Sequence, residues 1–196
     1  VMPTECVGKD NTQSMDGART AMFNPELVYQ GITDLALIFN VEERGKEVVA
    51  ELKAREAAAV EKAKALNLPD DLSAVFWYSS ADIEIDPYVA GAYGVPGWML
   101  STLGVKNVVD SAEEWPTVGW ETIAKADPTI IVAGKMERRR FPADDVAVKH
   151  QFLKDDPVAS LMSAVKNGHV VDMDAQAMNP TIRTIEGIEV LADAIE

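Results

Sequence analysis

The chain has 196 residues, of which 47% are hydrophobic and 26% charged, and its formal net charge is −14. This composition is typical of a globular protein with a sizeable core, not of a disordered chain. The acidic balance argues against nucleic acid as a partner, because a phosphate backbone requires a positively charged surface. No apolar run reaches the roughly 18–20 residues that a membrane-spanning helix needs.

The residues that commonly bind metals are scarce. Cys6 is the only cysteine, which excludes an internal disulfide and a cysteine-rich metal site. The two histidines, His150 and His169, are too far apart in sequence to suggest a histidine cluster, and His169 opens a predicted strand. We therefore predict no direct metal ligands.

The N-terminal part of the chain predicts a loop followed by an amphipathic helix. Residues 1–22 lack periodicity and read as a loop. Asn24-Pro25-Glu26 is a favourable helix start, and the helix is predicted to continue to Phe39. Its apolar face consists of Leu27, Val28, Ile32, Leu35, Ile38 and Phe39. Such a face needs a cover, and we expect either a second copy of the chain or residues 1–22 to provide it.

Residues 42–66 form the strongest predicted helix. Alanine, glutamate, lysine and arginine dominate it, and only Gly45 weakens it. Glu51 and Arg55 are spaced to form an ion pair within the helix. At 1.5 Å per residue the helix is about 37 Å long. It is either an ordinary surface helix or a rigid strut between two lobes. Residues 67–72 contain a proline turn and mark the predicted domain boundary.

The remainder alternates between strands and helices. Strands are predicted at 73–78, 106–109, 129–133 and 169–173, and helices at 96–103, 119–127, 157–165 and 181–195. Residues 79–87 and 110–117 read as loops, and residues 135–150 as an irregular charged segment. Alternation of this kind predicts an α/β fold, with a mainly parallel sheet and helices on both faces.

Ligands of open parallel sheets bind beyond the carboxyl ends of the strands. There the sequence places aromatic residues, arginines and a methionine, which we take as candidate ligand-binding residues: Tyr78, Tyr93, Trp98, Arg138, Arg139, Arg140 and Met178. Guanidinium groups suit carboxylate or chelate oxygens. The alternative, purely structural interpretation is that Trp98 packs in a core and that one of the arginines pairs with Asp144 or Asp145.

Two motifs resemble a known family. Residues 120–132 read Trp-Glu-x-Ile-x-x-x-Asp-Pro-x-Ile-Ile-Val, and residues 156–174 contain Asp-Pro-Val-x-x-Leu-Met followed by Ala-Val-Lys-Asn-Gly-His. Both resemble the second lobe of the substrate-binding proteins that serve ABC importers of iron-siderophore, haem and cobalamin complexes. The resemblance covers roughly residues 24–196.

This resemblance implies a domain organisation. Proteins of the family are exported, to the periplasm or to the outer side of the membrane on an anchor, and have two lobes joined by one long helix. Residues 1–41 would be a remnant of the N-terminal lobe, 42–67 the inter-lobe helix, and 68–196 a Rossmann-like C-terminal ligand-binding lobe. A whole first lobe needs on the order of a hundred residues or more, so most of it would be missing.

The resemblance also implies roles for individual residues. The arginines at 138–140 match a loop that grips iron-siderophore complexes in the family. Glu121 matches a surface glutamate that docks into an arginine pocket of the permease, although from the sequence alone it is a first-turn residue balancing the helix dipole. The implied protein is not an enzyme and needs no cofactor.

Two other functions remain open from the residues alone. One is a cytoplasmic α/β enzyme that uses the arginines to hold an anionic metabolite, and the other is a pure interaction domain. The sequence shows no phosphate-binding loop and no nucleophile elbow, so no catalytic residue is predicted.

Overall fold

The computed structural model describes residue 19 and residues 21–196. Cys6 and most of the predicted loop at 1–22 lie outside this range. The helices are α1 (Glu26–Ile38), α2 (Glu42–Ala65), α3 (Val95–Leu103), α4 (Trp120–Ala126), α5 (Val146–Asp155), α6 (Ser163–Lys166) and α7 (Thr184–Ala194). The strands are β1 (Ser73–Ser79), β2 (Tyr88–Val89), β3 (Lys106–Asn107), β4 (Ile130–Lys135) and β5 (Val170–Asp174).

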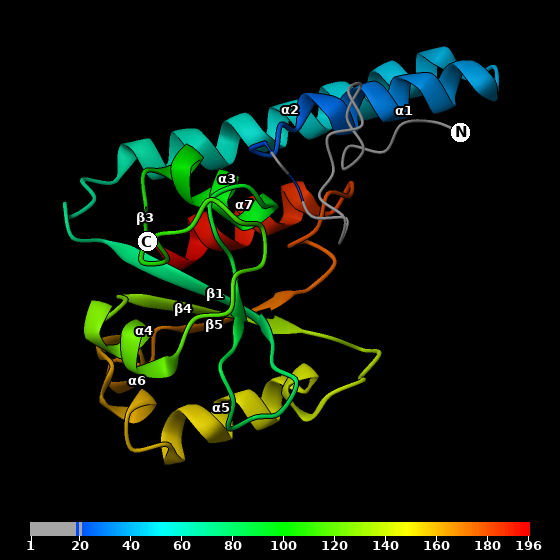
Figure 1. Cartoon of the computed structure of the whole chain (residues 1–196). Coiled ribbons are helices and arrows are strands. Elements are labelled where there is room, and N and C mark those ends of the chain that lie inside the picture. The colour runs from blue at the N-terminus through cyan, green and yellow to red at the C-terminus, as the bar shows by residue number, and fades with distance from the viewer. Residues whose placement is uncertain (1–18, 20) are drawn as a thin grey trace.

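The strands form one mixed sheet around β1, as Figure 1 shows. Strand β1 pairs with β4 in parallel, and β4 pairs with β5 in parallel. On the other edge of β1, β3 pairs in parallel near its start and β2 in the antiparallel sense near its end. The predicted mainly parallel α/β fold is confirmed. The short strand β2 was not predicted, because two residues carry no detectable alternation.

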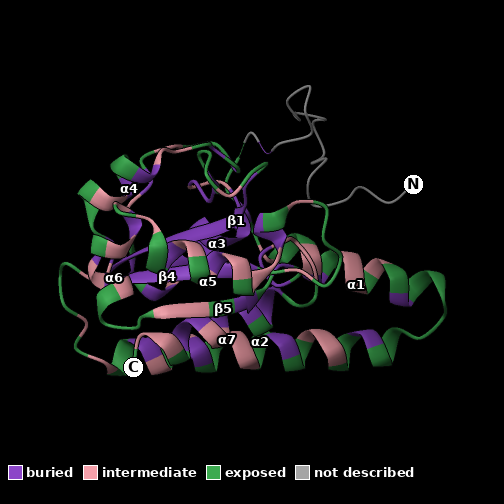
Figure 2. Cartoon of the chain, turned by 90° about the horizontal axis from the view of Figure 1, so that it is seen from below, coloured by how far each residue is buried: buried purple, intermediate pink, exposed green. Residues whose placement is uncertain are grey.

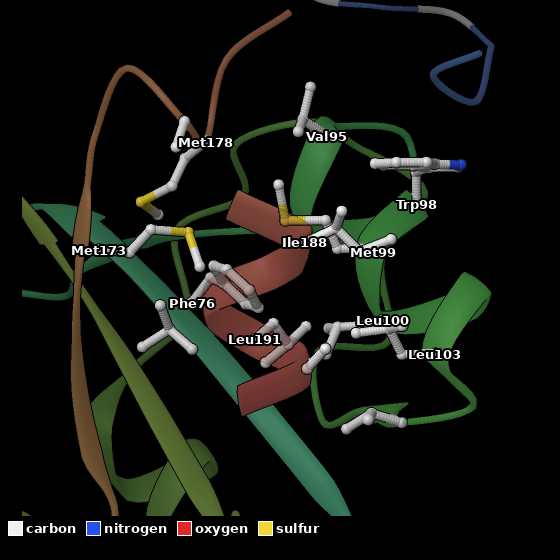
Figure 3. Close-up of a cluster of buried hydrophobic side chains, with 14 of the residues drawn as sticks. Phe76, Val95, Trp98, Met99, Leu100, Leu103, Met173, Met178, Ile188 and Leu191 are labelled. Atoms are coloured by element: carbon white, nitrogen blue, oxygen red, sulfur yellow. The ribbon is translucent and has the colours of Figure 1, made fainter. Parts of the chain in front are cut away.

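Helices cover both faces of the sheet. Phe76 and Trp77 are successive residues of β1, point to opposite faces, and are both fully buried. Phe76 belongs to the core beneath α2, α3 and α7, part of which is shown in Figure 3. Trp77 belongs to the core beneath α4, α5 and α6, where it packs against Trp120 and Phe152 at centroid distances of 4.8 and 5.8 Å.

Helices α1 and α2 lie side by side and extend beyond the sheet at one end (Figures 1 and 2). Helix α2 contributes Leu52, Ala59 and Ala63 to the core with α3 and α7. The hydroxyl of Tyr29 on α1 donates to Glu56 on α2 at 2.5 Å. No helix among the described residues is long and apolar enough to cross a membrane.

The predicted apolar face of α1 is only partly buried. Val28 and Ile32 pack against the core, but four of the six predicted residues are exposed, namely Leu27, Leu35, Ile38 and Phe39. Cover of these four side chains by a second copy or by residues 1–22 stays a prediction, because almost all of that segment lies outside the described residues. Helix α2 meets one side of α1 only, so the other side keeps its apolar surface.

Two local predictions need correction. Arg55 does not pair with Glu51; its guanidinium makes two hydrogen bonds, of 2.8 and 2.6 Å, to Glu189 on α7. The charged segment at 135–150 is not irregular throughout. It contains a 3-10 turn, Pro142–Asp144, and the first half of α5, residues 146–150.

The predicted helix at 157–165 is broken in two. Asp156 caps its start as expected, accepting from the amides of Val158 and Ala159. After the 3-10 turn Ala159–Leu161, however, Met162 is extended and a new short helix, α6, begins. Asp127 caps that second start by accepting from the amide and the hydroxyl of Ser163, each at 2.6 Å. The cap of the second helix is thus a residue 36 positions away in the sequence.

Candidate functional site

The carboxyl ends of β1, β4 and β5 meet at one edge of the sheet, which we call the carboxyl edge. The last register pair of β4 and β5 is Lys135 with Asp174, so the segments that follow these two strands start side by side. The first of them, residues 136–141, is called the arginine loop below. The rule that parallel strands present their loops at one edge therefore applies here.

All three arginines of the arginine loop are exposed. Arg139 forms an ion pair with Asp145 at 2.6 Å, which confirms the predicted pairing of one arginine with a neighbouring aspartate. The guanidinium of Arg140 lies 5.2 Å from the ring centre of Phe141, and its amide donates to Asp144. The loop thus presents a cluster of cationic groups on a chain whose net charge is −14.

The aromatic candidates are more enclosed than the sequence suggested. Tyr78 and Trp98 are both 8% exposed, and Tyr93 is half-buried. Phe23 packs edge-on against Trp98 with ring centres 5.4 Å apart, and its amide donates to the carbonyl of Tyr93 at 2.9 Å. The segment before α1 therefore covers this part of the edge, and Trp98 belongs to the core cluster of Figure 3.

A buried ion pair lies beside Tyr78. The amide of Arg19 donates to Glu114 at 3.0 Å, and the Nε of Arg19 lies 3.4 Å from the same carboxylate. Burial raises the pKa of Glu114, although Arg19 opposes the shift. Burial also raises the pKa of Tyr78, and the neighbouring Glu114 adds to it. The Tyr78 phenol is therefore neutral at all physiological pH values.

Met178 is not at the surface. Its side chain is 1% exposed and packs with Met173 in the core, as Figure 3 shows. The sequence rule identifies which residues follow a strand, but not which way their side chains turn. For Met178 the apolar side chain turns inward, where its burial is favourable.

Two residues at the carboxyl edge, Arg183 and Lys149, are not predicted from the sequence, and Asp144 is predicted only as a possible partner of an arginine. Arg183, at the start of α7, forms an exposed ion pair with Asp174 at the end of β5, at 2.8 Å. Lys149 and Asp144 are buried beneath the arginine loop. Arg183 follows β5 and was accessible to the same reasoning that selected the other arginines. Lys149 shares a helix face with the buried Leu153, but it lies in a segment that is predicted to be irregular, so the sequence does not indicate its burial.

Glu121 lies in the first turn of α4 and is exposed. This helix starts at Gly119 as predicted, and its first turn is where a carboxylate is favoured by the helix dipole. The residue before α4, Gly119, lies close to Asp86 in the loop that follows β1.

Elsewhere the surface carries an open groove of about 640 Å³ between the loop after β1 and helix α5. Its lining residues are Ile83, Glu84, Val148, Gln151, Phe152, Asp155, Asp156 and Pro157. None of the predicted ligand-binding residues lines it. Within residues 19 and 21–196, no three histidine, cysteine, aspartate or glutamate side chains are grouped to hold a metal ion.

A mainly parallel sheet with helices on both faces, a projecting helix pair and an exposed arginine loop at the carboxyl edge suit a lobe of a binding protein. A sequence profile described as periplasmic binding protein matches residues 6–177. The chain belongs to the periplasmic binding protein family. No curated protein matches the chain.

Solved structures of this family share the fold. A possible iron-binding, periplasmic solute-binding protein from Staphylococcus epidermidis is 22% identical, with a TM-score of 0.69 over 90% of this chain and 64% of its own. The ABC-type Fe3+-hydroxamate transport system protein from Saccharomonospora viridis is 23% identical, with a TM-score of 0.73 over 89% and 57%. The periplasmic haem-binding protein RhuT from Roseiflexus sp. is 18% identical, with a TM-score of 0.71 over 88% and 63%.

The chain thus spans less than two thirds of the length of each of these structures. At such identities the likeness shows the fold and not the ligand. It matches the mainly parallel α/β architecture that the sequence predicts.

Proposed function

We propose that this chain is the ligand-binding second lobe, with its bridging helix, of a solute-binding protein of an ABC importer. The whole protein would bind an iron chelate of the siderophore type outside the cytoplasm and deliver it to a permease, without catalysing a reaction. The observation that carries the proposal is the family match over residues 6–177. Haem and cobalamin complexes are the other ligand classes to test.

The division of the chain follows from the same proposal. Residues 1–41 would belong to the first lobe, 42–67 would bridge, and 68–196 would form the second lobe. The projection of α1 and the start of α2 beyond the sheet supports this division (Figure 1). The short span relative to the solved structures supports it too. Two lobes of this kind would close on a chelate between them.

The arginine loop is the best candidate for contact with an anionic chelate. Arg138, Arg139 and Arg140 are exposed at the carboxyl edge, and Arg183 lies on the neighbouring segment. Planar guanidinium groups pair with chelate oxygens in a bidentate manner. Tyr93 and Trp98 would contribute only where Phe23 moves away, and Tyr78 only where the Arg19–Glu114 pair does. Met178 would support the edge from below.

Tryptophan fluorescence during titration tests the ligand class. A ferric trihydroxamate, haemin and cyanocobalamin would be titrated into a chain that carries both lobes, with the 196-residue chain alongside. We expect one iron chelate to quench the fluorescence, with weaker binding by the 196-residue chain because on this proposal it carries only one of the two lobes. A two-lobed protein that responds to none of the three would refute the proposal.

The proposed permease contact is Glu121. A matched control exists in Glu186, which is also exposed in the first turn of a helix and therefore has the same dipole interaction. In the two-lobed protein, Glu121→Gln is expected to weaken binding to the permease by about 10-fold or more, as for loss of a paired interface charge. Glu186→Gln should leave it unchanged. Equal effects of the two substitutions would contradict the assignment.

The alternative function, a cytoplasmic enzyme acting on an anionic metabolite, gains nothing from the family match or from the solved structures. A turnover assay is therefore not the first experiment. Ligand titration decides between the candidates more directly.

A further inference from the structure

A lysine is buried beneath the carboxyl edge. Lys149, on α5, is 0% exposed, and its ammonium lies 5.3 Å from the ring centre of Trp77. The ammonium donates to the backbone carbonyls of Tyr78 at 2.7 Å and Gly134 at 2.5 Å, with that of Trp77 at 3.5 Å. A buried lysine is costly unless its charge is bonded, so its place in the structure calls for an explanation.

The carbonyls that it binds lie where two strands separate. Trp77 and Ala133 form the last register pair of β1 and β4. Beyond that pair, β1 continues along β2 through an irregularity between Trp77 and Ser79, while β4 continues along β5. Buried carbonyls without a partner are unfavourable. The ammonium of Lys149 bonds one carbonyl from each strand and so bridges the separating ends.

The approach of the two strand ends is close. A Cβ atom on Gly134 would lie 3.2 Å from the carbonyl oxygens of both Trp77 and Tyr78. A side chain at this position would crowd the carbonyl group to which Lys149 donates. Because Gly134 has no side chain, the ends of β1 and β4 can lie close enough for one ammonium group to reach the carbonyls of both strands.

Asp144 connects the end of β1 to the arginine loop. It is 3% exposed, and its carboxylate accepts from the hydroxyl of Ser79, at the end of β1. Its other oxygen accepts from the amides of Arg140 and Phe141 at 2.6 and 2.9 Å. One carboxylate therefore ties the end of β1 to the arginine loop.

We infer that Lys149, together with Asp144, is a positioning residue that holds the end of β1 and the arginine loop at a fixed spacing for ligand binding. This inference rests on the proposed function of the carboxyl edge. Lys149 is fully buried, so it acts through the backbone that it bonds and does not itself contact ligand. Asp144 supplies the second fixed point, on the amides of the loop itself.

The electrostatics agree with this geometry. Burial lowers the pKa of Lys149 to about 8, while the carboxylates of Asp144 and Asp172 favour the charged form. Burial disfavours ionisation of Asp144, but hydrogen bonds from Ser79, Phe141 and Arg140 outweigh it and keep the pKa of this carboxyl below its usual value. Asp144 is thus charged at neutral pH and accepts from all three donors.

Amide hydrogen exchange on the 196-residue chain tests the inference without any ligand. The variant Lys149→Met is compared with Leu153→Ala, which disturbs the same buried face of α5 one turn later without touching the carbonyls. Exchange of the Arg140 and Phe141 amides is measured relative to the Ile131 amide in the core. We expect a rise of 10-fold or more in Lys149→Met and little relative change in Leu153→Ala. Equal changes in the two variants would overturn the inference.

If Lys149→Met does not fold, Ser79→Ala provides the second variant. It removes one hydroxyl from the network and leaves the amides of the arginine loop untouched. Faster exchange at Arg140 and Phe141 is again expected, because the loop loses its connection to β1. Unchanged exchange in Ser79→Ala would overturn the inference.

Ligand binding provides a separate measurement. With a ferric trihydroxamate or haemin, whichever the unsubstituted chain binds, Lys149→Met should weaken binding at least 10-fold, and Leu153→Ala by less than 3-fold. Equal affinities of the two variants would count against Lys149. If the unsubstituted two-lobed protein binds neither probe, the proposed function fails, and hydrogen exchange still decides the role of Lys149.

Discussion

The sheet and the α1–α2 pair bury their apolar residues to very different extents. Phe76 and Trp77, in the centre of the sheet, are 0% exposed, whereas Leu37 and Phe39, at the end of α1, are 65% and 71% exposed. A sheet with helices on both faces covers its own apolar surface. Two helices side by side share only one seam, and any apolar residue outside that seam needs a third partner.

The two regions therefore differ in how completely their own residues bury their apolar surface. The core of the lobe is complete within the described residues. The α1–α2 pair is anchored to that core through α2, but α1 carries a surface that nothing in the described residues covers. The same substitution, made at a phenylalanine in each region, measures this difference in burial.

The largest expected effect comes from one substitution made in both regions. Phe76→Ala should lower the free energy of unfolding by about 3–5 kcal/mol, because a buried phenylalanine leaves a cavity. Phe39→Ala should change it by less than about 0.5 kcal/mol, as is usual for an exposed site. Urea denaturation of both variants checks this. A cost above about 1.5 kcal/mol for Phe39→Ala would show that the α1 face is covered in solution.

Titration of the buried Lys149 should make the stability of the chain depend on pH. The pKa of Lys149 is about 8 in the folded chain and near 10.5 when unfolded. Between these values the unfolded chain binds more protons, so the free energy of unfolding rises with pH. Below pH 8 the lysine is charged in both states, and the burial penalty is fully present.

The rise attributable to Lys149 should be about 2 kcal/mol between pH 7.5 and 9.5. The neutral amine keeps two donors for the carbonyls of Tyr78 and Gly134. Urea denaturation at both pH values checks this, with Lys149→Met as reference to cancel other titrating groups. An identical pH dependence in the variant would mean that Lys149 does not titrate in this range.

The seam between α1 and α2 should be sensitive to one added methyl group. A Cβ on Gly45 would lie 2.4 Å from the Cβ of Ala36, whereas one on Gly31 has nothing within 4 Å. Gly45→Ala should therefore destabilise the chain by about 1 kcal/mol, the cost of overpacking exceeding the gain in helix propensity. Gly31→Ala should stabilise it by about 0.5–1 kcal/mol. Thermal unfolding followed by circular dichroism separates the two, and equal shifts would contradict the close contact.

The smallest expected effect concerns association. We propose that the exposed face of α1 pairs with a second copy when no other lobe covers it. Sedimentation velocity should show a concentration-dependent increase in the sedimentation coefficient. Phe39→Ser should remove it while leaving the unfolding free energy of the monomer within about 0.5 kcal/mol. A monomer at all concentrations would contradict the proposal.

The local elements follow from the sequence because they depend on neighbouring residues. Alternation, capping residues and propensity predict α2, α4, β1 and β4 to within about two residues, and the order of strands and helices predicts a parallel sheet. The positions of Arg138–Arg140 after β4 and of Glu121 on α4 follow in the same way, since both need only the end of a known element.

Only the tertiary structure decides which side chains turn inward and which distant residues meet. Arg55 pairs with Glu189 instead of its helical neighbour, and Asp127 starts α6 from another element. Met178 fills the core, and Lys149 lies in a buried site made by two strand ends. The physical reason is that burial and hydrogen bonding depend on every residue that the fold brings close in space. Sequence spacing identifies only the partners within one or two turns of the same helix.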